Sequence, residues 1–125
     1  MINLTNVIRN EQLDELTEAI KSNPHLVNQP DERGFTPLVL ATYLGKETVA
    51  RLLIENGADI DARDAMMGNT ALMGVCFKGA VKLAQLLIEK GANTALKNNN
   101  GETALDFAKN GGHQEIVSIL TQRIF

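Results

Sequence analysis

The stretch GFTPLVLATYLGKETVARLLIENGADIDARD, at residues 34–64, decides the fold because its pattern returns twice further along the chain. It is followed by GNTALMGVCFKGAVKLAQLLIEKGANTALKN at residues 68–98 and by GETALDFAKNGGHQEIVSILTQRIF at residues 101–125. The three units begin at Gly34, Gly68 and Gly101, so the period is 34 and then 33 residues. A second glycine and an apolar pair also recur in phase. A period of this length indicates a protein built from stacked repeats.

Each unit predicts two short helices joined by a glycine turn. The threonine two residues after the first glycine is suited to cap the first helix, because its hydroxyl can accept a hydrogen bond from a free backbone N–H. Pro37 then occupies the first helical position of one unit, where its missing N–H costs nothing. The second helix repeats apolar residues at i, i+3 and i+4, which gives it one face for packing. The capping threonines are Thr36, Thr70 and Thr103, and the glycines expected to end helices are Gly45, Gly57, Gly79, Gly91 and Gly112.

This pattern resembles the ankyrin repeat, whose signature is a T-P-L-H-x-A run in a period of 33 residues. TPLVLA at residues 36–41 matches five of the six positions, and GADIDA at residues 57–62 resembles the family's usual loop entry. The resemblance covers residues 31–125 and implies an all-α solenoid of stacked helix-turn-helix units. One departure is that Val39, Met73 and Asp106 replace the family's histidine. That histidine bonds to neighbouring backbone in the family, so some of this network should be absent or rebuilt here.

We expect the chain to form a single ankyrin-repeat domain over residues 1–125. It divides into an N-terminal capping unit at residues 1–30, repeats at 31–63 and 64–97, and a C-terminal capping repeat at 98–125. The first of these is a degenerate unit in which Pro24 stands in place of a turn glycine. Polar residues on the last predicted helix suit the end of a solenoid. With both ends capped, we expect this domain to be the whole functional unit.

Composition excludes several classes of protein. Twelve basic and fifteen acidic residues give a formal net charge of −3, which favours neither nucleic acid nor an anionic membrane as a partner. The single cysteine, Cys76, excludes an intrachain disulfide and fits a reducing compartment. The N-terminus lacks the basic and apolar runs of a signal peptide. No apolar run approaches the roughly 18 residues of a membrane span. We therefore expect a cytoplasmic protein.

The sequence shows no recognisable catalytic or metal-binding constellation. His25 and His113 fall in units far apart along the stack, and structural or solvated roles are expected for both. Cys76 has no histidine nearby in the sequence, which favours a packed or half-exposed thiol over a reactive one. The three aspartates of GADIDARD, residues 57–64, lack the central glycine and terminal glutamate of a calcium-binding EF-hand loop. We expect no enzymatic activity, no cofactor and no bound metal.

A binding surface follows from the resemblance to the ankyrin family. In such solenoids the loop tips and the first helices line a concave face, and the second helices form the convex back. Three of the five aromatic residues fall on these concave positions, and an exposed apolar cluster usually marks a partner site. Carried over position by position, the partner-binding residues are Arg33, Phe35, Tyr43, Leu44, Met66, Met67, Asn69, Phe77 and Lys78.

The second loop tip is unusual. Asp64 and Gly68 are four residues apart, whereas the matching residues of the other two tips are three apart, and the longer tip carries Met66 and Met67. Flexible methionines adapt to irregular partner surfaces, which favours a role in binding. In the alternative reading the methionines fold inward between neighbouring tips, and Tyr43 and Phe77 pack against each other across repeats. A structural role is expected for Phe107.

These features predict a non-catalytic protein–protein interaction module that binds another protein through its concave face. We expect a monomer. The alternative is a homo-oligomer that buries the same apolar patch or the C-terminal Ile124 and Phe125. A third hypothesis is an enzyme whose site is completed by a partner. The domain also resembles small stand-alone ankyrin proteins of bacteria, some of which accompany an enzyme such as a catalase. That resemblance names no partner.

Overall fold

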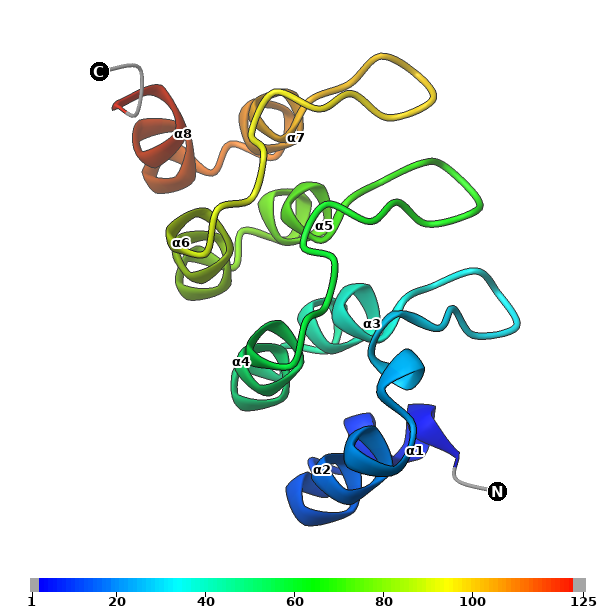
Figure 1. Cartoon of the computed structure of the whole chain (residues 1–125). Helices are drawn as coiled ribbons and strands as arrows, with labels where there is room; N and C mark the ends of the chain where they lie inside the picture. Colours follow the sequence, from blue (N-terminus) through cyan, green and yellow to red (C-terminus); the bar gives the residue numbers. More distant parts are fainter. Residues whose placement is uncertain (1–2, 123–125) are drawn as a thin grey trace.

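The computed structural model describes residues 3–122, and all of the regular structure in that range is helical. The helices pair in chain order, and the odd-numbered and even-numbered helices form two layers (Figure 1). Three long loops, the tips, project from the odd-numbered layer on the side away from the even-numbered layer (Figure 1). The α-helices are α1 (Leu4–Arg9), α2 (Leu13–Ser22), α3 (Pro37–Tyr43), α4 (Glu47–Glu55), α5 (Ala71–Lys78), α6 (Val81–Glu89), α7 (Ala104–Asn110) and α8 (Gln114–Thr121), and a 3-10 helix, η1, spans Pro24–Asn28. The expectation of an all-α solenoid of stacked helix pairs is confirmed.

The predicted threonine caps are present in all three repeats. The hydroxyls of Thr36, Thr70 and Thr103 each accept a hydrogen bond from the backbone N–H three residues later, at 3.2, 3.3 and 3.2 Å. Pro37 is the first residue of α3, as expected. These caps satisfy backbone donors that a short helix would otherwise leave free, so they fix where each first helix begins.

The turn between the two helices of a pair has one backbone conformation throughout. Gly45, Gly79 and Gly112 have φ values of 74°, 77° and 71°, in the left-handed region that favours glycine. In the first pair the same place is taken by Glu11, whose φ is 52°. The hydrogen bonds of this turn match those after α3: Glu11 N–H donates to the carbonyl of Ile8 at 3.1 Å, as Gly45 N–H donates to that of Thr42. The first helix pair therefore keeps the turn without its glycine.

The core lies between the two layers and between successive pairs. Leu38, Leu72, Leu53 and Leu87 are almost completely buried and come from the first and second helices of two neighbouring repeats. Each pair alone would leave such residues in water, so burial against the next pair stabilises the stack. None of the helices in residues 3–122 is long and apolar enough to cross a membrane.

Two of the three residues that replace the family's histidine form local bonds instead, whereas Val39 has no polar side-chain atom. The carboxylate of Asp106 accepts a hydrogen bond from Thr103 N–H at 2.9 Å, and the sulfur of Met73 lies 3.4 Å from Thr70 N–H. Both bonds lie within their own repeat and complete the cap of the first helix. A bond between repeats comes from another histidine: His113 Nε2 lies 3.0 Å from the carbonyl oxygen of Phe77. The network is thus rebuilt in part, with different residues.

Candidate protein-binding groove

A groove of about 520 Å³ runs between the tips and the first helices. Its floor is formed by α3 and α5, and the first and second tips form one wall. We call this the concave groove. Its lining residues are Arg9, Arg33, Phe35, Val39, Leu40, Thr42, Tyr43, Leu44, Asp64, Met66, Met67, Asn69, Thr70, Ala71, Met73, Gly74, Phe77 and Phe107.

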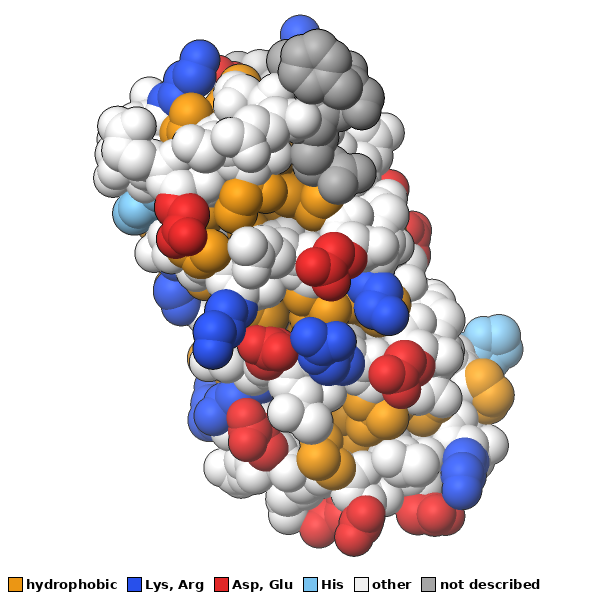
Figure 2. Space-filling view, turned by 90° about the vertical axis from the view of Figure 1, so that its left-hand side faces the viewer, with side chains coloured by type: hydrophobic (Ala, Val, Ile, Leu, Met, Phe, Trp, Pro, Cys, Tyr) orange, Lys and Arg blue, Asp and Glu red, His pale blue; other side chains and the backbone are white. Residues whose placement is uncertain are grey.

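Exposed apolar side chains gather at this groove. The large hydrophobic residues that remain exposed within residues 3–122 are Tyr43 (59%), Met66 (66%), Met67 (43%) and Phe77 (64%). All four line the concave groove. By contrast, the back of the molecule carries charged side chains of both signs, spread among small apolar strips (Figure 2). Large exposed side chains that cluster in one hollow, instead of scattering, are typical of a binding surface.

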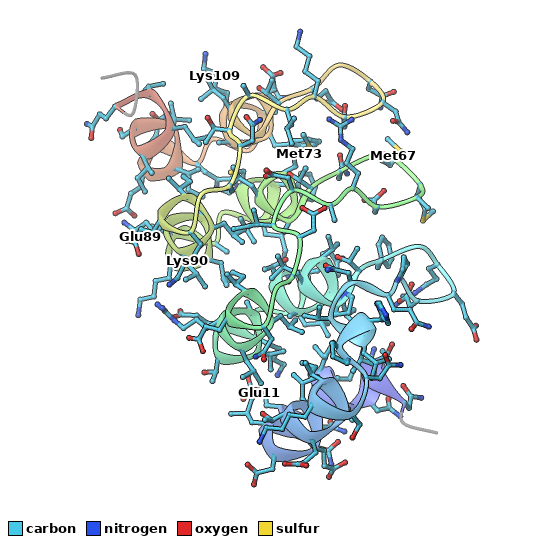
Figure 3. All side chains as sticks on the ribbon, viewed as in Figure 1. Glu11, Met67, Met73, Glu89, Lys90 and Lys109 are labelled. Carbon is cyan, nitrogen blue, oxygen red and sulfur yellow. The ribbon has the colours of Figure 1, made fainter. Side chains whose placement is uncertain are left out.

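Met66 and Met67 are exposed on the second tip, whose backbone is fixed by hydrogen bonds. The carboxylate oxygen Oδ1 of Asp64 accepts hydrogen bonds from the backbone N–H groups of Met66, Met67 and Gly68, at 3.0, 2.7 and 3.1 Å. The first and third tips each have two such bonds, made by Asp31 and Asn98. One buried carboxylate thus organises the extra residue of this tip. Met67 lies in the tip and Met73 on α5 (Figure 3).

Neighbouring tips are stacked through their backbones. Ala65 N–H donates to the carbonyl of Gly34 at 3.2 Å, and Asn99 N–H donates to the carbonyl of Met67 at 2.9 Å. A Cβ atom on Gly34 would lie 2.3 Å from the Cβ of Ala65, so only glycine permits this approach. The side chain of Asn98 adds a 2.8 Å bond to that of Asn69. The wall of the concave groove is therefore tied together across three repeats.

The aromatic residues of the groove are fixed by different partners. The ammonium group of Lys78 lies 4.5 Å from the ring centroid of Tyr43 and donates a hydrogen bond to the backbone carbonyl of the same residue. The ring of Phe77 meets that of Phe107 edge to face, with centroids 6.1 Å apart. Both arrangements are favourable aromatic contacts. Tyr43 and Phe77 are therefore held separately and present exposed surface to the groove.

One arginine of the groove is positioned by the first tip. The guanidinium of Arg33 lies 5.1 Å from the ring centroid of Phe35 and forms a 3.2 Å ion pair with Asp31. Burial alone would raise the pKa of Asp31, but hydrogen bonds from the N–H groups of Phe35 and Arg33 and the nearby guanidinium outweigh it. The pKa of Asp31 therefore lies below its ordinary value, and the carboxylate stays ionised beside Arg33.

The structure brings eight of the nine residues expected from the sequence to the concave groove: Arg33, Phe35, Tyr43, Leu44, Met66, Met67, Asn69 and Phe77. Lys78 lies beside the lining and contacts it through Tyr43. Arg9 was missed, although it precedes Tyr43 by one period of 34 residues. Phe107, which was assigned a structural role, is half-buried against the core and also lines the groove.

The thiol of Cys76 and the imidazoles of His25 and His113 are not part of the groove lining. Cys76 is fully buried, and this burial raises the pKa of its thiol to about 12. The thiol is packed, as the sequence suggested, and is protonated at neutral pH. His113 is used in the bond between repeats, and His25 is exposed on η1. Within residues 3–122, no three His, Cys, Asp or Glu side chains are grouped so as to hold a metal ion.

Comparison with known proteins identifies the class. The family model for the ankyrin repeat matches residues 33–65, and the model for ankyrin repeats in three copies matches residues 63–124. The chain belongs to the ankyrin-repeat family, whose repeats are generally non-catalytic protein–protein interaction modules.

Three relatives show how the similarity is distributed. The mouse ankyrin repeat and SAM domain-containing protein 6 is 36% identical over 105 residues, covering 82% of this chain and 12% of that protein. The ankyrin repeat and KH domain-containing protein mask of Drosophila melanogaster is 36% identical over 90 residues, covering 70% of this chain and 2% of that protein. The human DNA-binding protein RFXANK is 50% identical over 48 residues, covering 38% of this chain and 18% of that protein. The chain thus spans only a small part of each relative.

Proposed function

We propose that this protein is a non-catalytic module that binds a partner protein through the concave groove. The observation that carries the proposal is the coincidence of Tyr43, Met66, Met67 and Phe77, the large exposed apolar residues of the described chain, in one hollow. A partner segment lying there would remove this surface from water. Binding sites of this kind draw most of their free energy from a few buried apolar and aromatic anchors.

The order of the groove supports the same function. The side chains of Tyr43 and Phe77 are already held by Lys78 and Phe107. The second tip is fixed by the bonds to Asp64. A surface that is ordered before binding loses less conformational entropy when the partner arrives, so more of the contact energy appears as affinity.

The proposal is tested by affinity capture from a lysate of the source cells with three immobilised proteins. These are the wild type, the groove variant Tyr43→Ala/Met66→Ala/Phe77→Ala, and a control, Lys82→Ala/Gln85→Ala/Glu89→Ala, changed at exposed positions of α6. Circular dichroism must give equal helicity for all three. We expect a protein that is retained by the wild type and the control and lost from the groove variant. Equal retention by all three, or loss from the control alone, would place binding outside the groove and contradict the proposal.

The same samples test the alternative of self-assembly. Light scattering of the wild type at micromolar concentration should give the mass of a monomer. A stable dimer that the groove variant fails to form would show that the concave groove is occupied by a second copy of the chain. That outcome would mean that the function of the groove is homo-oligomerisation, not the binding of a separate partner protein.

A further inference from the structure

One position of the repeat carries a different type of side chain in each successive helix pair along the concave groove. Arg9, Tyr43, Phe77 and Asn110 take the same place near the end of the successive first helices α1, α3, α5 and α7, one period apart. Arg9, Tyr43 and Phe77 line the groove. A segment that lies along the stack would therefore meet a cation over the first pair and then two aromatic rings.

Two arginines, Arg9 and Arg33, line the groove, although the whole chain has a formal net charge of −3. Arg33 is already paired with Asp31 at 3.2 Å, and the groove lining also includes the carboxylate of Asp64. The carboxylate of Asp64 is buried, and its Oδ1 already accepts hydrogen bonds from three backbone N–H groups. Arg9 is exposed and forms no ion pair with any residue in the range 3–122. Its guanidinium is available to a carboxylate of a partner.

A second hollow, of about 630 Å³, lies over α1, η1 and the first tip, and it shares Arg33, Phe35 and Leu40 with the concave groove. Its lining also contains the carboxylates of Asp31 and Glu32, so this second hollow carries no excess of positive charge. The row of Arg9, Tyr43 and Phe77, by contrast, crosses three successive helix pairs within the concave groove. A surface of this form suits an elongated segment better than a compact small molecule.

We propose that the partner presents an acidic–apolar segment to the concave groove. Its carboxylate meets Arg9, and its bulky apolar side chains cover Tyr43 and Phe77. This inference rests on the proposed function and adds the chemistry of the partner and its direction along the stack. Packed helices lie about 8–10 Å apart. An extended segment rises about 3.3 Å per residue, so about three residues should separate its acidic residue from the first apolar anchor. About three more residues should separate the first anchor from the second.

The experiment is a selection from a phage-displayed library of random 12-residue peptides. The baits are the wild type, Arg9→Glu, Lys82→Glu and the double variant Tyr43→Ala/Phe77→Ala. Lys82→Glu makes the same change in net charge at an exposed position of α6, on the back of the molecule. Selected peptides are then synthesised with and without their acidic residues replaced by the amides, and their affinities are measured at two salt concentrations.

We expect the wild type and Lys82→Glu to select peptides with Asp or Glu about three residues before or after bulky apolar residues. Replacing the acidic residues by amides should weaken binding to the wild type about tenfold, as loss of a charged hydrogen bond does. Arg9→Glu should lose this preference, and added salt should reduce it because the contact is partly exposed.

Failure of the acidic–apolar inference and failure of the proposed function give different results in this experiment. Apolar peptides without an excess of acidic residues, bound equally by the wild type and Arg9→Glu, would overturn the acidic–apolar inference and leave the concave groove as the binding site. Peptides that bind the Tyr43→Ala/Phe77→Ala variant as well as the wild type would overturn the proposed function itself. A selection that enriches no peptide on the wild type would count against both.

Discussion

Lys78 holds Tyr43 of the preceding repeat in place at the rim of the concave groove. Its ammonium group lies 4.5 Å from the ring centroid of Tyr43 and donates a hydrogen bond to the backbone carbonyl of that residue. One cation therefore contacts both the side chain and the backbone at the end of α3 from the end of α5. Because the contact links two neighbouring repeats, it both positions the Tyr43 side chain in the groove and stabilises the stacking of those repeats.

Replacing Lys78 by alanine should loosen both the groove and the stack. A partly exposed cation–π contact and a charged hydrogen bond are together worth about 1 kcal/mol, so we expect the free energy of unfolding to fall by about that amount. Urea unfolding followed by circular dichroism measures this change. Lys82→Ala, on α6, is the matched control and should change stability by less than about 0.5 kcal/mol. Equal effects of the two substitutions would show that the contact with Tyr43 contributes nothing.

Asp64 should be the residue on which the second tip most depends. Asp64→Ala removes the acceptor of three backbone N–H groups, and we expect a loss of about 2–3 kcal/mol in the free energy of unfolding. Asp64→Asn keeps one side-chain oxygen as an acceptor, so its loss should be smaller. Amide hydrogen exchange at Met66 and Met67 should accelerate in Asp64→Ala. Unchanged exchange there would mean that the tip is held by its bonds to the neighbouring tips alone.

The turn after α1 offers a stabilising substitution. Glu11 has a φ of 52°, and its ion pair with Lys46 is long, at 4.0 Å, and partly exposed. Glu11 lies where the first helix pair meets the second (Figure 3). Glycine relieves the backbone strain at the cost of a more flexible unfolded chain, so Glu11→Gly should raise the free energy of unfolding by about 0.5–1 kcal/mol.

Gly45 is the matched test of the same backbone conformation. Its φ is 74°, and a Cβ atom added there would meet nothing within 4 Å. Gly45→Ala therefore isolates the backbone cost and should destabilise the protein by about 1 kcal/mol. If Glu11→Gly and Gly45→Ala change stability in the same direction, the equivalence of the two turns is wrong.

Much of the fold followed from the sequence because local chemistry repeats in phase. The threonine caps, Pro37 and the turn glycines act within a few residues of themselves, so their roles could be inferred from spacing alone. Glu11 escaped this reasoning because nothing in its residue type predicts a left-handed conformation. It became visible only when the turns of α1 and α3 were compared in three dimensions.

Residues of the candidate site could be predicted where the repeat determines their position. They could not be predicted where side-chain contacts between repeats determine the exposure or the role of a residue. Tyr43, Met66 and Phe77 could be assigned to the concave face because their phase in the repeat was combined with the resemblance to the ankyrin family. The exposure of the methionines depends on hydrogen bonds made by Asp64, which spacing does not reveal. Phe107 both packs against the core and lines the groove, because its ring reaches Phe77 of the neighbouring repeat.

Cys76 should report on opening of the stack. It is fully buried on α5, and burial raises the pKa of its thiol to about 12, so little thiolate exists at pH 8. We expect a thiol reagent at that pH to modify native protein far more slowly than protein unfolded in urea. Destabilising variants such as Asp64→Ala should react faster than the wild type. Modification of the native protein at the rate of the unfolded chain would contradict the packed environment.

The central claim is that a partner protein lies in the concave groove, and site-specific photo-crosslinking tests it most directly. A benzophenone amino acid is placed at Phe77, in the groove, or at Gln85, an exposed residue of α6, and each protein is irradiated in a lysate of the source cells. The account predicts a defined adduct of larger mass from the Phe77 position that is absent from the Gln85 position. An adduct from Gln85 alone, or the same adduct from both positions, would contradict it.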